Sequence, residues 1–150
     1  MGLIRKVYLD TSVISALFDK RTPERMALTK TAWKTLKDYD VYISELVVDE
    51  LSTAPDDKKL QFMDSILNFT VIKITKEMEN LAHEYITEGI FPEKYYDDAL
   101  HVAIATVNDI RYLLSWIFKH LVKVKTRRMV SLLNTNYEYS TIEIIVPPEL

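Results

Sequence analysis

Short apolar runs alternate with helical segments along this chain, and that alternation limits the choice of fold more than any other feature. Five runs have the length and composition of strands; they lie at residues 5–9, 41–43, 71–74, 111–114 and 142–146. Apolar residues at helical spacing predict helices between them, at residues 12–18, 23–38, 45–51, 55–67, 76–88, 97–107 and, as one or two helices, 117–134. Strands that are separated by helices pair in parallel. We therefore predict an α/β fold, a three-layer α/β/α sandwich with a central, mostly parallel sheet of four or five strands.

Several helix ends carry sequence signals. Hydroxyl side chains at a helix start can accept a hydrogen bond from a first-turn N–H group. The candidate caps of this kind are Thr11, Ser12, Thr22, Ser44 and Thr75. Gly89 is expected to end the helix that Thr75 begins.

The composition is that of one globular domain over residues 1–150, with 48% hydrophobic and 27% charged residues. No apolar stretch approaches the roughly 20 residues that a membrane span needs. Arg5 and Lys6, followed at once by the first strand, leave no apolar core for a signal peptide. The absence of cysteine excludes disulfides, thiolate zinc sites and cysteine nucleophiles. These features fit a cytoplasmic protein without a membrane partner.

Glycine content and net charge narrow the functional classes further. Only two glycines occur, so the chain has no glycine-rich loop that could cradle the phosphates of a nucleotide cofactor. The net charge of −3 argues against nucleic-acid binding through overall charge. It still permits a local basic patch beside a local acidic pocket.

Asp10 directly follows the first predicted strand. Its carboxylate should therefore lie at the carboxyl end of that strand, where open α/β sheets place their ligands. The simpler interpretation, that Asp10 only caps the following helix, is about equally acceptable when this residue is considered alone.

Two other acids also stand where burial is expected. Glu50 follows Leu46 and Val47 by four and three residues, so it shares their core-facing stripe, unless it lies at the rim and pairs with a lysine. Asp98 opens a helix that is apolar almost all round. A first-turn acid can simply complement the helix dipole, but here it can also face inward across the end of the sheet.

His101 lies one turn after Asp98 and Asp97, and it can either bind a metal or, as we favour, form a hydrogen bond to an acid or to the backbone. If Asp10, Glu50 and Asp98 meet at one sheet edge, their mutual repulsion requires a cation. Oxygen ligands favour Mg²⁺ or Mn²⁺, and such ions commonly engage substrate phosphates. A phosphodiester is therefore the expected substrate.

These segments resemble the PIN-domain family of metal-dependent ribonucleases, especially the VapC-type toxins of toxin–antitoxin systems. The resemblance rests on four segments in order, at residues 7–12, 44–51, 98–105 and 112–121. It implies a PIN-like fold and a Mg²⁺- or Mn²⁺-dependent endoribonuclease. The implied site residues are Asp10, Glu50 and Asp98 as catalytic metal ligands, with Ser12 and Ser115 lining the site.

The chain departs from this family at Ile117, where Asp or Asn usually follows Ser115 by two residues. Asp97 is the nearest candidate for an additional ligand. This departure keeps a second hypothesis open, in which the chain is a catalytically impaired PIN-like module that binds RNA or a protein. A phosphatase with Asp10 as the nucleophile is a weaker alternative, because position 12 is serine rather than a second aspartate.

A basic stretch follows the last of these segments and can steer RNA towards the site, although it can equally be a solvated helix face. Its residues are Lys119, His120, Lys123, Lys125, Arg127 and Arg128; the expected RNA contacts are Lys119, His120, Lys123 and Arg127. Tyr95, Tyr96 and Trp116 are candidates for stacking on bases, although Trp116 is better explained by core packing. The resemblance further implies a cognate antitoxin and a homodimer. The apolar pattern of the helix at residues 23–36 is compatible with such an interface and equally with ordinary core packing.

Overall fold

The computed structural model describes residues 4–150 and contains a sheet of five parallel strands in the order β3-β2-β1-β4-β5. The prediction of a mostly parallel sheet of four or five strands is confirmed. The strands are β1 (Arg5–Leu9), β2 (Tyr39–Ser44), β3 (Thr70–Ile72), β4 (Tyr112–Leu114) and β5 (Glu143–Ile145).

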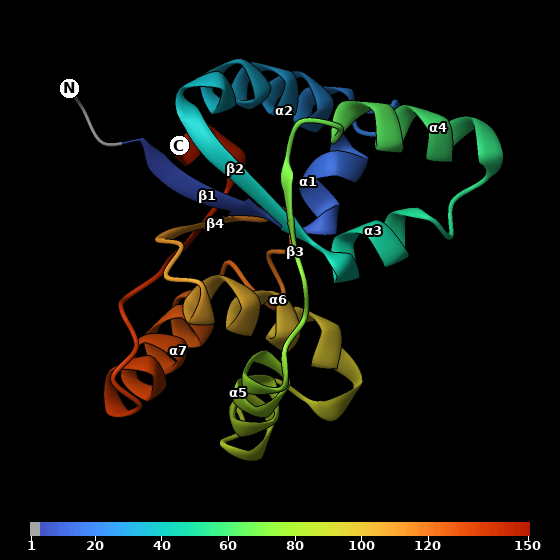
Figure 1. The fold of residues 1–150 in the computed structure, drawn as a ribbon. Coiled ribbons are helices and arrows are strands. Elements are labelled where there is room, and N and C mark those ends of the chain that lie inside the picture. The colour runs from blue at the N-terminus through green and yellow to red at the C-terminus, as the bar shows by residue number, and fades with distance from the viewer. Residues whose placement is uncertain (1–3) are drawn as a thin grey trace.

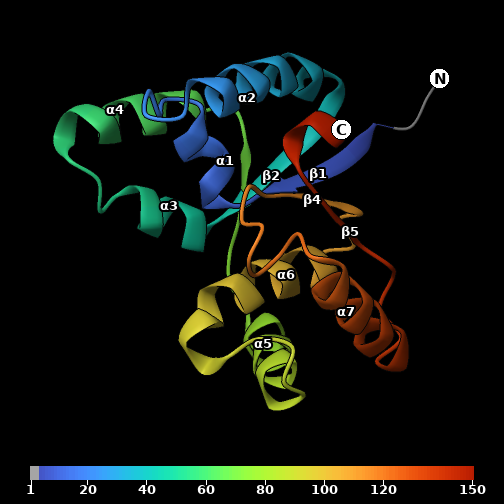
Figure 2. The same ribbon diagram turned by 180° about the vertical axis from the view of Figure 1, so that it is seen from behind.

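Helices cover both faces of this sheet, as predicted (Figure 1). One face carries α1 (Thr11–Ala16), α2 (Pro23–Thr35), α3 (Glu45–Leu51) and α4 (Asp56–Ser65). The other face carries α5 (Lys76–Thr87), α6 (Tyr96–Val107) and α7 (Val124–Asn136), as the reverse view also shows (Figure 2). Short 3₁₀ turns lie at Leu36–Asp38, Glu93–Tyr95 and Pro147–Glu149. None of the helices within residues 4–150 is long and apolar enough to cross a membrane.

The strand order explains this division of the helices. From β1 the chain proceeds through β2 to β3 in one direction, and then it returns to β4 and β5 on the other side of β1. Because parallel crossovers are right-handed, reversing the direction of winding moves the connecting helices to the opposite face. The strand order therefore reverses at the carboxyl end of β1, and ligands bind at such a reversal in folds of this class.

The central strand β1 is buried on both sides, and its Val7, Tyr8 and Leu9 are fully inaccessible to solvent. Tyr8 pairs in register with Tyr42 of β2 and with Leu113 of β4. A run of apolar residues is typical of a strand that is covered on both faces. The burial of β1 fixes the position of the residue that follows it in sequence.

Helix α6 is the most deeply buried helix, since every residue from 99 to 106 is buried. A helix that is hydrophobic all round packs inside a protein, and α6 lies between the sheet and α5. A cluster of buried polar side chains near the C-terminal end of α6 links α5, α6 and α7. The Tyr85 hydroxyl donates to Asn134 Oδ1 at 2.5 Å, and Asn134 Nδ2 donates to Thr106 Oγ1 at 3.2 Å.

The predicted helix ends are only partly correct. Thr75 caps α5 by accepting from Met78 N at 3.4 Å, and Gly89 follows that helix with a positive φ of 76°. The hydroxyls of Thr11, Ser12, Thr22 and Ser44 do not cap their helices. Three of the four are used elsewhere, since Thr11, Ser12 and Ser44 bond to other side chains. In the segment predicted as one or two helices, residues 117–123 form turns, and the single helix α7 begins at residue 124.

Candidate functional site

Asp10 lies at the carboxyl end of β1, directly after the last residue of that strand. Its backbone N–H donates to Leu114 O of β4 at 3.2 Å, and its side chain has no exposed surface. Ser12 Oγ donates to Asp10 Oδ1 at 2.5 Å and itself accepts from Trp116 N at 2.9 Å. Asp10 Oδ2 is buried and has no hydrogen-bond partner among residues 4–150. Asp10 stands at the N-cap position of α1 but makes no side-chain cap, so the simple capping interpretation is wrong.

The surroundings of Asp10 disfavour its charge. Burial raises the pKa of the Asp10 carboxyl, and the negative charge of Asp98 raises it further. The charge of His101 and the hydroxyls of Ser115 and Ser12 act in the opposite direction without cancelling the rise. A buried carboxylate with one unpaired oxygen is costly to a folded protein unless a cation or a proton neutralises it.

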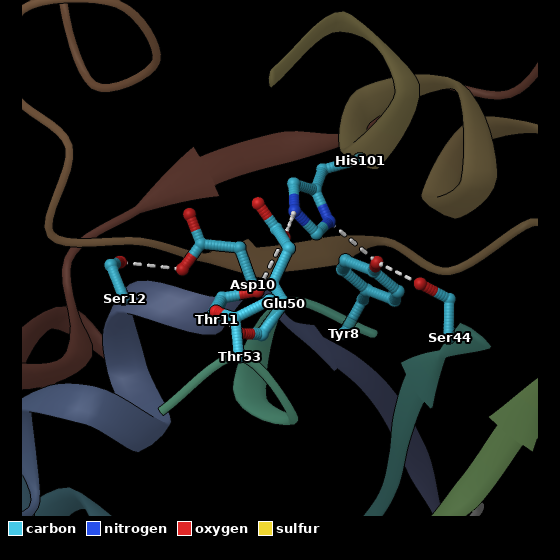
Figure 3. A network of polar contacts seen from close by, with 8 residues as sticks. All are labelled: Tyr8, Asp10, Thr11, Ser12, Ser44, Glu50, Thr53 and His101. Carbon is cyan, nitrogen blue, oxygen red and sulfur yellow. Dashed lines mark hydrogen bonds and ion pairs between the residues drawn. The ribbon is translucent and has the colours of Figure 1, made fainter. Parts of the chain in front are cut away.

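Glu50 enters the same region from α3, and its side chain is 32% exposed. Its Oε1 accepts from Thr11 Oγ1 at 2.6 Å and lies 2.9 Å from His101 Nε2 (Figure 3). His101 Nδ1 lies 2.7 Å from the Tyr8 hydroxyl, which is 2.8 Å from Ser44 Oγ. A chain in which Ser44 donates to Tyr8, Tyr8 to His101, and His101 to Glu50 satisfies every one of these buried groups.

This chain of hydrogen bonds sets the protonation of its two titratable members. Burial alone would raise the pKa of Glu50, but its contacts with His101 and Thr11 outweigh burial and lower the pKa. Burial alone would lower the pKa of His101, but the bond to Glu50 and the charges of Asp10, Glu50 and Asp98 raise it. Glu50 is therefore favoured as a carboxylate, and protonation of His101 is favoured relative to a free histidine. A protonated ring donates from Nδ1 as well, and the Tyr8 hydroxyl then accepts from His101 and donates to Ser44. The prediction that His101 hydrogen-bonds to an acid is confirmed.

Asp98, at the start of α6, is 14% exposed and is paired with a histidine that lies 22 residues later. His120 Nδ1 lies 2.9 Å from Asp98 Oδ2, and the Tyr95 ring stacks on the His120 ring with centroids 3.6 Å apart. Burial raises the pKa of Asp98, and the charge of Glu50 adds to the rise, whereas the bond from His120 opposes it. The negative charge of Glu50 therefore acts on the pKa of Asp98, just as the negative charge of Asp98 acts on the pKa of Asp10.

Asp98 raises the pKa of Asp10, and Glu50 raises the pKa of Asp98, but the three carboxylates do not lie close enough together to form a metal site in this arrangement. Within residues 4–150, no group of three His, Cys, Asp or Glu side chains is close enough together to hold a metal. The physical reason is that Glu50 is drawn to His101 and Asp98 is drawn to His120. The donor set nevertheless fits a hard cation, because it consists of carboxylate oxygens, and one of them, Asp10 Oδ2, is buried without a partner.

The remaining predicted residues fall at different distances from this centre. Ser115 is buried beside Asp10 and accepts from Ile117 N at 2.9 Å. Asp97 is exposed, unlike Asp98. Of the expected RNA contacts, His120 lies at the site itself, because it bonds to Asp98. Lys119 and Lys123 are exposed. Arg127 Nη1 lies 3.5 Å from the Ile144 carbonyl of β5.

Sequence reasoning missed the side chains that hold the acids in place. Tyr8 and Ser44 have the pattern of ordinary strand residues, and their link to His101 depends on how β1, β2 and α6 pack. The pairing of Asp98 with His120 was also missed, since it depends on the irregular turn at residues 117–123. The signal that was available is the presence of polar residues inside otherwise apolar segments.

Comparison with known proteins agrees with this fold. The solved structure of VapC20 from Mycobacterium tuberculosis, described as a toxin that cleaves the sarcin-ricin loop, is similar with a TM-score of 0.58 and 21% identity, over 71% of this chain and 86% of that one. VapBC2 from Rickettsia felis, bound to a DNA fragment from its promoter, is similar with a TM-score of 0.57 and 12% identity, over 93% of this chain and 96% of that one. No curated protein is close enough in sequence to count as a match.

A family model provides stronger evidence than these distant structural likenesses. The model of the PIN domain matches residues 7–115, which is more than half of the chain and spans Asp10, Glu50, Asp98 and Ser115. This chain therefore belongs to the PIN-domain family.

Proposed function

We propose that this chain is a metal-dependent endoribonuclease that hydrolyses RNA phosphodiester bonds with Mg²⁺ or Mn²⁺ as cofactor. The observation that carries the proposal is the buried Asp10 carboxylate, whose Oδ2 lacks a hydrogen-bond partner among residues 4–150 while the charge of Asp98 acts on it; the charge of Glu50 acts on Asp98 in turn. An uncompensated buried carboxylate lowers stability, and a cation is the natural compensation. Membership of the PIN-domain family and the likeness to VapC20, a loop-cleaving toxin, support the same reaction class.

In this proposal Asp10, Asp98 and Glu50 would hold the cation, with Ser12 and Ser115 orienting Asp10. A bound divalent ion supplies an activated water and neutralises charge on the phosphoryl oxygens. Asp10 keeps a fixed direction because Ser12 links it to the backbone of Trp116. Glu50 is kept ionised by His101 and Thr11, so that it can accept a proton or a cation at neutral pH. The exposed side of Glu50 leaves it open to solvent and to substrate.

The test compares the wild-type chain with Asp10→Asn on a single-stranded RNA, with Mn²⁺, with Mg²⁺ and with a chelator. We expect cleavage only by the wild type and only with metal. The matched control is Asp97→Asn, which removes the exposed neighbouring charge and should leave cleavage intact. Equal cleavage by wild type and Asp10→Asn would refute the assignment of Asp10.

A catalytically impaired module that binds RNA or a protein is the second candidate, and two observations favour it. Ile117 stands where the resemblance leads us to expect Asp or Asn, and within residues 4–150 no three His, Cys, Asp or Glu side chains lie close enough together to hold a metal. Calorimetric titration with Mn²⁺ separates the two candidates. Micromolar binding that is lost in Glu50→Gln indicates the enzyme, whereas no binding at millimolar Mn²⁺ indicates the impaired module.

We further propose that the chain is the toxin of a toxin–antitoxin pair, with a cognate antitoxin and a homodimer as its assemblies. The likeness to VapBC2 supports the antitoxin. The exposed Leu28 on α2 is one residue available to a dimer interface. Coexpression with the neighbouring open reading frame, followed by measurement of mass and of RNA cleavage, tests both assemblies. A chain that stays monomeric and equally active would count against them.

A further inference from the structure

A small cavity lies immediately beside Asp10, on the side of α2. Its volume is about 230 Å³, and Ser12, whose hydroxyl bonds to Asp10, forms part of its wall. The rest of the wall comes from α1, from the start of α2 and from the segment after β4. Its other lining residues are Ser15, Ala16, Asp19, Thr22, Arg25, Trp116 and Ile117. Any molecule in this cavity would lie next to the proposed reaction centre.

Arg25 brings a positive charge to this cavity that no acid neutralises. Among the ion pairs of residues 4–150, none involves Arg25. The one acid in the wall, Asp19, is already paired with Arg21 at 2.9 Å and 3.1 Å. Arg25 thus offers its guanidinium donors to an external acceptor, and a planar guanidinium matches a phosphate with two parallel hydrogen bonds.

Two aromatic rings hold this guanidinium in place. Its carbon lies 5.1 Å from the centre of the Trp116 ring and 5.7 Å from the centre of the Phe118 ring. Trp116 is fixed in turn, because its indole N–H donates to Thr29 Oγ1 at 3.0 Å and its backbone N–H donates to Ser12. Phe118, by contrast, is 51% exposed, although phenylalanine side chains are usually buried.

A free guanidinium beside an exposed aromatic ring suits the binding of single-stranded RNA. The backbone phosphates need cationic partners, and the unpaired bases stack on aromatic side chains. Ile117 adds an apolar, uncharged side chain to the wall, so it places no negative charge near a phosphate bound to Arg25.

Phe118 does not line the cavity but lies beside it, against Arg25 and Trp116. We propose that the cavity and this neighbouring ring together bind the RNA nucleotide next to the scissile phosphate, with Arg25 contacting its phosphate and Phe118 stacking on its base. This subsite rests on the proposed ribonuclease function, and it adds a specificity for unpaired RNA. Arg25 and Phe118 are binding residues in this assignment, and neither takes part in the reaction.

Binding is measured in the Asp10→Asn background, which cannot cleave the probe, by fluorescence anisotropy with a labelled single-stranded RNA of mixed sequence over a range of salt concentrations. Arg25→Gln should weaken binding and lower the slope of log Kd against log salt by about 0.7, the change expected for one lost phosphate contact on a single strand. Phe118→Ala should weaken binding by about tenfold without changing that slope. Arg25→Lys should keep the slope but not the full affinity.

The matched control is Lys34→Gln, which removes the same charge from the same helix, nine residues or roughly 13 Å along its axis. It should leave affinity and slope unchanged. A duplex RNA of the same sequence should bind more weakly than the single strand, and Phe118→Ala should not affect it. Urea unfolding of each variant confirms that it is folded before binding is compared.

The subsite would be overturned if Arg25→Gln and Lys34→Gln had equal effects on RNA binding, or if Phe118→Ala had no effect. Cleavage by the wild-type chain would still support the ribonuclease function in that case. A wild-type chain that neither binds nor cleaves RNA with Mn²⁺ or Mg²⁺ would remove the ribonuclease function and the subsite together. In the active background, the variants should raise the RNA concentration needed for half-maximal cleavage more than they lower the maximal rate.

Discussion

Replacing Asp10 with asparagine should make the metal-free protein more stable and, at the same time, inactive. The wild-type carboxylate is fully buried, and its Oδ2 has no hydrogen-bond partner. Leaving a buried polar group unsatisfied costs about 1–3 kcal/mol, and more when the group is charged. For a chain of this length, about 2 kcal/mol corresponds to a rise in Tm of roughly 4–8 °C.

The gain in stability of Asp10→Asn over wild type should depend on pH, and its direction follows from the raised pKa of Asp10. The unfolded chain titrates near the ordinary value of 3.8, whereas the folded protein holds its proton to higher pH. The stability associated with this group is therefore fully present below the unfolded pKa and is lost as pH rises through the folded pKa. The difference between Asp10→Asn and wild type should be small in acid and greatest at neutral pH.

Urea unfolding with a chelator, repeated across this pH range, measures the difference directly. Asp97→Asn is the control, because it removes an exposed neighbouring charge and should give no such gain. Adding Mn²⁺ should stabilise the wild type and not Asp10→Asn, since a ligand stabilises only the state that binds it. A variant that is less stable than wild type at neutral pH, without metal, would refute the reasoning about buried charge.

Three other substitutions separate stability from activity. His101→Leu should lower stability by about 1–3 kcal/mol in urea unfolding, because it removes one buried hydrogen bond from Tyr8 and one from Glu50. Tyr85→Phe should cost about 1 kcal/mol through the lost bond to Asn134, with RNA cleavage unchanged. His120→Ala removes a bond that lowers the pKa of Asp98, so Asp98 should take up its proton at a higher pH than in wild type. As the pH is lowered, Mn²⁺ binding measured by calorimetry should therefore begin to weaken at a higher pH in this variant. An unchanged pH profile would contradict this link.

The layered fold was predictable because its signal is local. Each strand shows as an apolar run and each helix as a periodic stripe, so the alternation that defines the α/β class can be seen without knowing any contact. The position of Asp10 followed from the rule that ligands bind at the carboxyl ends of parallel strands. The order of the strands was not predictable in this way, because it depends on pairings between segments that are distant in the sequence.

The side chains around the acids were less predictable for the same reason. A threonine at a helix start is usually a cap, but Thr11 bonds to Glu50 instead, since a carboxylate is a stronger acceptor that stands within reach. The cavity beside Asp10 combines residues from α1, α2 and the segment after β4, and no short motif indicates it. Patterns in the sequence located the acids, and tertiary packing selected their partners.

A crystal grown with Mn²⁺ would reveal whether a divalent cation binds among Asp10, Glu50 and Asp98. We expect an anomalous peak at about 2.1 Å from an oxygen of Asp10, with Asp98 or Glu50 turned from its histidine to share the ion. The same crystal of Asp10→Asn should lack this peak. No peak in a wild-type crystal at saturating Mn²⁺, with both carboxylates still paired to His101 and His120, would show that these acids do not form a metal site.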